Sequence, residues 1–310
     1  MPDQRGPAPT PTGRFAPSPT GELHLGNLRT ALVAWVSARA SGGRFVVRME
    51  DLDRVTANPA HEQAQLRDLT ALGLDWDGEV VRQSQRFHLY EAAIDDLQQR
   101  GLCYPCFCSR REIREAARAP HGVPSEGAYP GTCARLSPAE RSELARSGRP
   151  SALRLHASGA VVTVHDQLAG DLSAVVDDVV VRRNDGVPAY NLAVVVDDAA
   201  QGITEVVRGD DLLATTPRQV HLQRLLGLPT PAYMHVPLVV GADGLRLAKR
   251  HGAVTLAALA ARGVTAQEVV AILARSLGWG EVRTPCSPQE LVASFDPERL
   301  PRAPWTWTSP

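Results

Sequence analysis

The segment from Arg14 to Asn27 constrains the fold most strongly, because strand, turn and helix patterns follow one another within it. Phe15 and Ala16 have the character of the end of a short buried strand. The Pro-Ser-Pro-Thr-Gly run that follows cannot be helical, since its two prolines fix φ and lack N–H donors. From His24 onward, apolar residues recur at three- and four-residue spacing, which predicts a helix with one apolar face. A strand therefore gives way to a helix N-terminus here.

The start of this helix is a candidate phosphate site. His24 and Gly26 lie where free N–H groups and the positive end of the helix dipole gather, and both favour phosphate. A glycine in the first turn also lets a flat ring or a phosphate approach the backbone. Taken alone, His-x-Gly has a simpler interpretation, in which the histidine caps the helix and the glycine permits a tight turn.

A second buried strand is predicted over residues 44–49, ending at Glu50. Strand, helix and strand in this order form a βαβ unit, and ligands bind at the carboxyl ends of strands in such sheets. Residues 14–18 and Glu50 are therefore expected at one crevice. Helices are predicted over Pro59–Leu72 and Phe87–Arg100.

Composition excludes several classes of protein. The chain has 310 residues, of which 44% are hydrophobic and 22% charged, enough to bury the core of one large or two modest domains. A net charge of −1 argues against a nonspecific nucleic-acid binder. No apolar run approaches the ~20 residues that span a bilayer. The proline-rich residues 1–12 are expected to be a disordered tail without a signal core, which indicates a cytoplasmic protein.

Clustered cysteines indicate a metal site in such a chain. Cys106 and Cys108 flank one residue, and Cys133 follows after a segment rich in Pro and Gly. Three thiolates and a fourth donor satisfy tetrahedral zinc, although reduced cysteines can also pack as small hydrophobes. The fourth donor stays open at this point, with Cys103 and His121 as candidates. The remote Cys286 is expected only to be packed.

The middle of the chain is rich in β patterns. Residues 151–183 alternate or form β-branched runs, and Asn184-Asp185-Gly186 predicts a hairpin turn. Residues 187–198 and 202–212 each have, taken alone, the pattern of an ordinary buried strand with solvated carboxylates at its end, but their combination argues against this interpretation. A strand that delivers polar residues at its carboxyl end is predicted over Thr204–Val207. A helix is predicted over Thr216–Leu226.

Lys249 is the only lysine in the chain, and all the other side chains among its lysines and arginines are arginine. Because a guanidinium differs from an ammonium in shape and hydration, this position is a candidate for a required ammonium. It lies in the run Arg246-Leu-Ala-Lys-Arg. Helices are predicted after it, over Leu256–Ala261 and Thr265–Leu277.

Together these motifs resemble class I aminoacyl-tRNA synthetases. His24-Leu-Gly-Asn resembles the HIGH signature, and Gly-Arg-Phe-Ala-Pro-Ser-Pro-Thr-Gly before it resembles the glutamyl and glutaminyl branch. The runs that begin at Tyr190 and Val206 resemble the same branch, and the run at Arg246 resembles KMSKS. The chain departs from these signatures at Asn27, Arg246 and Ala248.

The cysteine motifs narrow the resemblance to the short glutamyl-Q tRNA(Asp) synthetases. Cys-x-Cys-Ser-Arg followed by Tyr-Pro-Gly-Thr-Cys is similar to their zinc site, which implies Cys106, Cys108, Tyr129 and Cys133 as ligands. The resemblance covers roughly residues 13–277, and the long anticodon-binding region of full glutamyl-tRNA synthetases is not expected after Lys249.

The resemblance implies an α/β fold with a Rossmann-type nucleotide-binding domain, a β-rich inserted domain with zinc, and a short helical C-terminal region. The implied divisions are a tail (1–12), a first catalytic half (13–104), an inserted RNA-binding domain (105–186), a second catalytic half (187–262) and a helical remnant (263–310).

The implied activity is activation of L-glutamate by ATP with Mg²⁺ and transfer of the glutamyl group to queuosine in the anticodon stem-loop of tRNA(Asp). No membrane and no obligate protein partner is expected. The implied ATP-binding residues are His24, Gly26, Asn27 and Lys249, of which His24 and Lys249 are catalytic. The implied glutamate-binding residues are Arg14, Phe15, Ala16, Pro17, Ser18, Glu50, Tyr190 and Arg208. The alternatives are a truncated glutamyl-tRNA synthetase that charges the 3′ end, and a noncatalytic RNA-binding paralogue.

Overall fold

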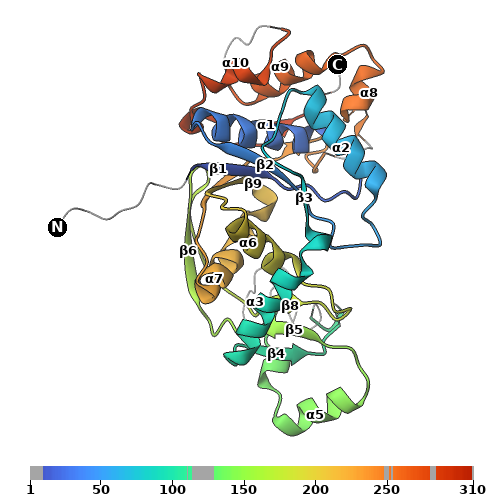
Figure 1. Ribbon diagram of the computed structural model, residues 1–310, viewed down its shortest axis with the longest axis vertical. Coiled ribbons are helices and arrows are strands. Elements are labelled where there is room, and N and C mark those ends of the chain that lie inside the picture. Colours follow the sequence, from blue (N-terminus) through green and yellow to red (C-terminus); the bar gives the residue numbers. More distant parts are fainter. Residues whose placement is uncertain are drawn as a thin grey trace, which may run out of the picture.

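A seven-stranded sheet forms the centre of the computed structural model (Figure 1), which describes residues 10–109, 111–113, 129–247, 251–252, 254–279 and 284–308. The strand order is β3-β2-β1-β9-β10-β6-β7, and every pairing is parallel except that of the edge strand β7 with β6. The strands are β1 (Thr12–Phe15), β2 (Arg44–Met49), β3 (Val81–Arg82), β6 (Val161–Asp166), β7 (Gly170–Val175), β9 (Glu205–Gly209) and β10 (Ala232–Val236).

The strand order creates a switch point between β1 and β9. From β1 the chain builds outward through β2 and β3, and it later returns to pair β9 with the other side of β1, where Gly13 is opposite Glu205. Ligands of open α/β sheets bind outside the carboxyl ends of the strands at such a point. The predicted βαβ unit is confirmed, and its strand over residues 44–49 has the predicted bounds.

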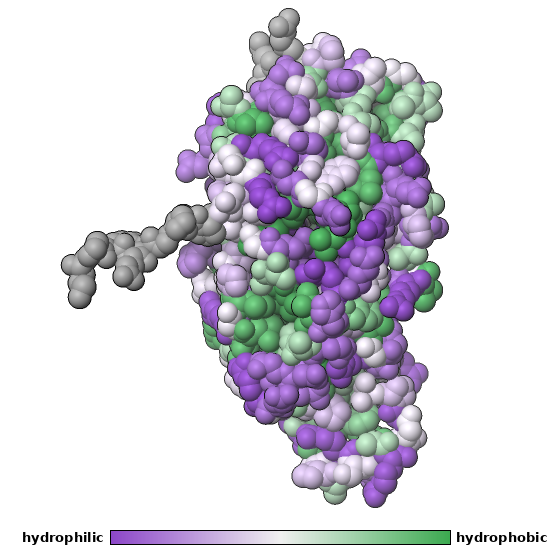
Figure 2. All heavy atoms as spheres, in the orientation of Figure 1, coloured by the Kyte–Doolittle hydropathy of each residue, from purple (hydrophilic) through white to green (hydrophobic). Residues whose placement is uncertain are grey.

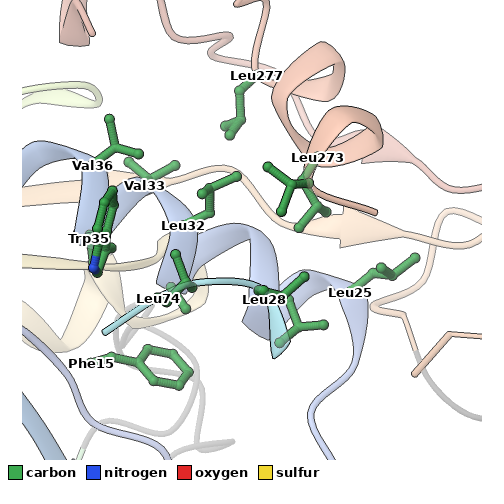
Figure 3. Close-up of a cluster of buried hydrophobic side chains, with 14 of the residues drawn as sticks. Phe15, Leu25, Leu28, Leu32, Val33, Trp35, Val36, Leu74, Leu273 and Leu277 are labelled. Atoms are coloured by element: carbon green, nitrogen blue, oxygen red, sulfur yellow. The ribbon is translucent and has the colours of Figure 1, made fainter. Parts of the chain in front are cut away.

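The predicted helix after His24 is α1 (Leu25–Ala40), but its single apolar face is wrong, because every residue from Ala31 to Ala38 is buried. Figure 3 shows Leu273 and Leu277 on one side of α1 and Phe15 on the other. The helix ends at Ala40, and Gly42 then adopts a left-handed φ of +64°, which glycine accepts without strain. The sheet and the C-terminal helices therefore enclose α1 in one hydrophobic core.

A second hydrophobic core lies between three helices and a small antiparallel sheet. The helices are α3 (Phe87–Gln99), α6 (Tyr190–Ala200) and α7 (Thr216–Leu226), and the sheet has the order β4-β5-β8. Its strands are β4 (Cys103–Cys106), β5 (Ala152–Leu155) and β8 (Val180–Arg182). On the face drawn in Figure 2, hydrophobic side chains gather mainly across the middle of the molecule, where α6 and α7 lie in Figure 1. The predicted β-rich stretch thus divides between two sheets, since β6 and β7 extend the large one.

The pattern of residues 187–198 is misleading, because most of this stretch is the helix α6 and not a buried strand. The carboxylates at the end of this stretch are buried and not solvated: Asp197 and Asp198 are 0% and 4% exposed. Both face Arg48, which compensates for the loss of water around them. The turn at Asn184–Gly186 is confirmed, but it is followed by a single bridge between Arg182 and Pro188 and then by α6.

The remaining elements surround these two cores. They are α2 (Pro59–Ala71), η1 (Gln83–Gln85), η2 (Cys133–Arg135), α5 (Pro138–Arg146), η3 (Asp210–Thr215), β11 (Val239–Val240), α8 (Leu256–Ala260), α9 (Ala266–Ser276), α10 (Pro288–Val292), η5 (Pro297–Arg299) and β12 (Trp305–Thr306). The helices predicted over Pro59–Leu72, Phe87–Arg100, Thr216–Leu226, Leu256–Ala261 and Thr265–Leu277 are confirmed to within a residue at each end.

Both ends of the chain bear on the earlier expectations. Residues 1–9 of the expected tail lie outside the described residues, and Thr12 already belongs to β1. Near the other end, β12 pairs in parallel with β11, a contact that the sequence does not predict. None of the described helices has the length and apolar character that crossing a bilayer requires.

Candidate active site

A cavity of about 540 Å³ opens at the carboxyl ends of β1, β2 and β9. It is lined by all the residues that the sequence assigns to glutamate, namely Arg14, Phe15, Ala16, Pro17, Ser18, Glu50, Tyr190 and Arg208. The described residues assigned to ATP line it too: His24, Gly26 and Asn27. Lys249 and its neighbours Ala248 and Arg250 lie outside the described residues. The chain therefore brings every described candidate into one space.

Two buried arginines line this cavity. Arg14 donates from Nη1 to the carbonyl of Val207 at 2.9 Å, and its Nε is 3.6 Å from a carboxylate oxygen of Asp198. Arg208 is 5% exposed, and its Nη1 has no hydrogen-bond partner among the described residues. Burial lowers the pKa of Arg14, and the nearby Arg208 adds to this effect. An anionic ligand would complete the environment of both guanidinium groups.

Glu50 supplies a carboxylate beside these cations. Its side chain is 9% exposed and accepts a hydrogen bond from Nη2 of Arg48 at 3.3 Å. Burial raises the pKa of Glu50, whereas Arg48 and Arg14 oppose that rise. Burial also raises the pKa of Tyr190, which keeps its phenol protonated and able to donate. A cationic group on a ligand would find its counter-charge at Glu50.

Buried ion pairs hold the charged residues of the cavity in place. Arg48, which is fully buried, donates to Asp198 at 2.8 Å. Asp197 accepts hydrogen bonds from Arg86 at 2.6 Å and from Tyr90 at 2.7 Å. The sequence does not predict this network, since its members come from distant segments and each looks like a solvated charge. Their spacing in the chain gives no signal, and only the strand ends at residues 50 and 208 hint at a polar cluster.

His24, which also lines the cavity, caps α1. Its Nδ1 accepts from the backbone N–H of Asn27 at 3.3 Å, and the backbone N–H of His24 donates to Oδ1 of Asn27 at 3.1 Å. Burial lowers the pKa of His24 to about 4, and Arg246 contributes to this. The neutral ring therefore carries its proton on Nε2, which is the group that remains to donate to a ligand. A Cβ at Gly26 would lie 2.9 Å from this ring, so the imidazole needs glycine there.

The KMSKS-like run begins beside the cavity. Arg246 lines the cavity and pairs with Asp211 at 2.7 Å, and the N–H of Leu247 donates to Val239 at 3.0 Å. Beyond the run, the carbonyl of Val254 accepts from the N–H of Leu25 at 2.8 Å. The described residues on both sides of Lys249 are thus fixed close to the start of α1. Asp211 and Gln65 also line the cavity, and sequence reasoning does not single them out.

A cluster of three thiols lies at the far end of the small sheet. The sulfurs of Cys106, Cys108 and Cys133 are all within 4.8 Å of one another. The phenol oxygen of Tyr129 is 3.4 Å from Sγ of Cys106 and 3.8 Å from Sγ of Cys108. Burial and the neighbouring thiols raise the pKa of Cys108 to about 12. Three sulfurs and one oxygen at these distances fit the donor set of a tetrahedral metal site.

The competing ligands are less well placed. Cys103, at the start of β4, is not part of the three-sulfur group among the described residues, and burial raises the pKa of its thiol to about 11. His121 lies outside the described residues. Cys286 is 2% exposed in the core around α1, as expected for a packed cysteine.

Residues 12–309 match the family model of the catalytic domain of class I tRNA synthetases for glutamate and glutamine. The chain belongs to this family. The class I synthetase fold is also seen in a glutamate-tRNA synthetase from Elizabethkingia anophelis, whose crystal structure superposes with a TM-score of 0.83 at 26% identity. That match covers 97% of this chain and 68% of the other.

Curated relatives within this synthetase family are similar over nearly their whole length. A glutamyl-Q tRNA(Asp) synthetase of Nocardia farcinica is 60% identical over 308 residues, covering 99% of this chain and 96% of the relative. A glutamyl-Q tRNA(Asp) synthetase of Symbiobacterium thermophilum is 49% identical over 304 residues, covering 94% of each.

Proposed function

We propose that the chain activates L-glutamate with ATP and transfers the glutamyl group to queuosine in the anticodon loop of tRNA(Asp). The observation that carries the proposal is the cavity, which is lined by two buried arginines, by Glu50 and by a histidine-capped helix N-terminus. The names of the relatives from Nocardia farcinica and Symbiobacterium thermophilum support this acceptor. Because its substrates are tRNA and ATP, the reaction would take place in the cytoplasm.

The cavity accounts for the choice of amino acid. Glutamate carries two carboxylates and one ammonium, which match Arg14, Arg208 and Glu50 in number and sign. Phe15 to Ser18 also line the cavity, and Tyr190 would orient the ligand by donating from its phenol. Glutamine would offer a neutral amide to a buried guanidinium, which costs on the order of 1–3 kcal/mol in lost pairing. We therefore expect glutamate to be preferred.

The first step, activation, joins glutamate to the α-phosphate of ATP within the cavity. A carboxylate oxygen of glutamate attacks the α-phosphorus of ATP, and pyrophosphate leaves with the electron pair of the broken P–O bond. His24 would donate from Nε2 to the phosphates, Asn27 would donate from its amide, and Gly26 would let the nucleotide approach. Lys249 would neutralise charge on the departing pyrophosphate. Mg²⁺ bound to the phosphates would spread that charge further.

Transfer to RNA completes the reaction. A hydroxyl of the queuosine ring attacks the carbonyl carbon of glutamyl-adenylate, and AMP leaves. We assign residues 105–186 to RNA binding and Zn²⁺ to the cluster of Cys106, Cys108, Tyr129 and Cys133, where it would stabilise this part of the chain. The catalytic halves would be residues 13–104 and 187–262, and residues 263–310 would cover α1.

The proposal is tested with two synthetic anticodon stem-loops that differ only in queuosine or guanosine at the wobble position. Incubation with enzyme, ATP and labelled glutamate should label the queuosine loop and leave the guanosine loop unlabelled. Labelled glutamine should give little or no product. With intact tRNA, the label should survive removal of the 3′ terminus.

Three outcomes would contradict the proposal, each in a different way. Label that leaves with the terminal adenosine would make the chain a glutamyl-tRNA synthetase of the ordinary kind. Absence of glutamate-dependent pyrophosphate exchange would indicate a noncatalytic RNA-binding paralogue. Comparable exchange with glutamine would overturn the assignment of Arg14 and Arg208.

A further inference from the structure

Arg208 is held by a chain of buried groups that lies outside the cavity. Its Nε is 3.0 Å from Nε2 of His235, a residue of β10. On the other side of the ring, Nδ1 of His235 is 2.6 Å from Oδ2 of Asp166, the last residue of β6. Both of these side chains are 0% exposed. Neither His235 nor Asp166 lines the cavity.

The donors and acceptors of Arg208, His235 and Asp166 allow only one placement of the protons between them. A guanidinium can only donate, so Nε2 of His235 must accept from Arg208, and the ring proton must be on Nδ1. Asp166 then accepts that proton's hydrogen bond, while its Oδ1 accepts from the backbone N–H groups of Leu168 and Ala169 at 3.0 and 2.7 Å. Burial lowers the pKa of His235, and the cation of Arg208 lowers it further while Asp166 opposes both. The imidazole is therefore neutral.

A second contact fixes the plane of the guanidinium. Nη2 of Arg208 donates to the hydroxyl of Thr216 at 2.9 Å, and the ring of Tyr233 lies 5.5 Å from the guanidinium carbon. Because the guanidinium is rigid and planar, fixing Nε and Nη2 also fixes the direction of Nη1. This is the atom that has no hydrogen-bond partner among the described residues, and Arg208 lines the cavity.

We propose that Asp166 and His235 are a positioning pair, which holds Arg208 so that Nη1 meets a carboxylate of the substrate. The inference rests on the proposed function, because it takes glutamate as the ligand of Arg208. It also connects two parts of the chain. Asp166 comes from the stretch assigned to RNA binding, and its strand pairs with β10 at Tyr233. The amino-acid site would thus depend on a residue of that stretch.

The variant Asp166→Asn tests the direction of the hydrogen bonds. Its amide oxygen would stay with the N–H groups of Leu168 and Ala169, so its NH₂ group would face both Nδ1 and the backbone N–H of His235, which bond Oδ2 of Asp166 at 2.6 and 3.1 Å. The ring proton would then move to Nε2, which lies 3.0 Å from Nε of Arg208 and 3.1 Å from the hydroxyl of Thr216, so Nε2 could no longer accept from Arg208. We expect the KM for glutamate in pyrophosphate exchange to rise by about tenfold to a hundredfold, as small displacements of a binding group can cause. The KM for ATP should stay within about twofold of its original value.

The chain contains a matched control on the same hairpin. His165 and Asp171 form a similar pair at 2.8 Å, but their side chains are 78% and 69% exposed. Asp171→Asn should therefore leave the KM for glutamate unchanged. An unchanged glutamate KM in Asp166→Asn would overturn the proposal, and so would an equal rise in both variants.

Two substitutions at His235 keep the test decisive if Asp166→Asn is unstable. His235→Gln retains an oxygen that can accept from Nε of Arg208, whereas His235→Met retains bulk without a comparable acceptor. The glutamate KM should be at least about fivefold lower in His235→Gln than in His235→Met, since only the first keeps the contact. Equal values would show a merely structural role. If the proposed function itself is wrong, the unmodified protein would show no glutamate-dependent pyrophosphate exchange. That result is distinct from a changed KM in a variant.

Discussion

Several single residues at the cavity have a role in folding as well as a proposed role toward the ligand. His24 satisfies the first turn of α1 through Nδ1, which leaves Nε2 for a ligand. Gly26 is needed because the imidazole occupies the space that a Cβ would take. The sequence locates both residues correctly, because a helix start is a local pattern. The neutral state of the imidazole is not predictable in this way, since it arises from burial and from Arg246, a residue distant in the sequence.

The pKa of His24 leads to the first prediction. In the free protein, the imidazole should titrate near pH 4 and stay neutral through the range in which an exposed histidine titrates. Between about pH 4 and 6.5 the unfolded chain binds the extra proton and the folded chain does not, so this residue destabilises the fold as pH falls through that range. NMR of the histidine ring protons, assigned by loss of the signal in His24→Asn, measures the midpoint. A midpoint close to 6.5 would contradict the buried, neutral ring.

Lys249 leads to the second prediction. Lys249→Ala should lower glutamate-dependent pyrophosphate exchange by on the order of a hundredfold or more, as loss of one charge contact in a transition state can. Lys249→Arg should also be impaired, because arginine occurs throughout the chain and yet not at this position. Arg100→Ala, which removes an exposed charge from the end of α3, is the control. Full activity of Lys249→Arg would show that no ammonium is needed.

At the scale of elements, the sequence predicts best where one periodicity governs a segment. The helices α2 and α7 follow from spacing and from their terminal residues. The helix α6 does not, because Val194–Val196 is a β-branched run that favours a strand by propensity. Tertiary contacts stabilise the helical form of this segment instead, since Asp198 of α6 pairs with Arg48 of β2 across 150 positions of the chain. No local pattern contains that information.

The predictable and unpredictable parts of the site differ in how far apart their residues lie in the sequence. The signature at Arg14–Asn27 is one continuous segment, so its residues reach the cavity together. The pair Asp166–His235 spans 69 positions and joins strands that are adjacent only in the folded sheet. Sequence reasoning therefore finds the motif residues that line the cavity, but it misses other lining residues such as Asp211 and Gln65 and the buried pair that holds Arg208.

The thiol cluster leads to the third prediction. Purified protein should contain one zinc per chain, held by Cys106, Cys108, Cys133 and Tyr129, and each cysteine-to-serine change among them should lower the zinc content. Cys103→Ser and His121→Ala are the matched controls and should keep the metal. Elemental analysis of protein never exposed to a chelator measures the content. Retention of zinc in Tyr129→Phe together with its loss in either control would show that the fourth ligand is misassigned.

At the scale of the whole molecule, segments distant in the sequence enclose the cavity. Leu238 and Val239 line it, and they belong to the segment that leads into the KMSKS-like run. The backbone of β12, close to the end of the chain, holds this segment through the bond from Trp305 N–H to the carbonyl of Leu238 at 3.0 Å. Arg302 adds a bond to the carbonyl of Leu168 at 2.9 Å. The C-terminal residues therefore contribute to the geometry of the site without lining it.

The final prediction isolates this backbone contact. Trp305→Ala and Trp305→Pro both remove the indole, but only proline also removes the N–H that bonds Leu238. Val239 packs 3.5 Å from the position of a Cβ built on Gly26, so displacement of β11 should affect the ATP end of the cavity first. We expect Trp305→Pro to raise the KM for ATP by about fivefold over Trp305→Ala, as the loss of one backbone hydrogen bond, worth about 0.5–1.5 kcal/mol net, allows. The KM for glutamate should change less, because Arg14, Glu50 and Arg208 are held by β1, β2 and β9 and their own buried partners. Equal ATP constants in the two variants would mean that β12 only covers the core and does not hold the active site.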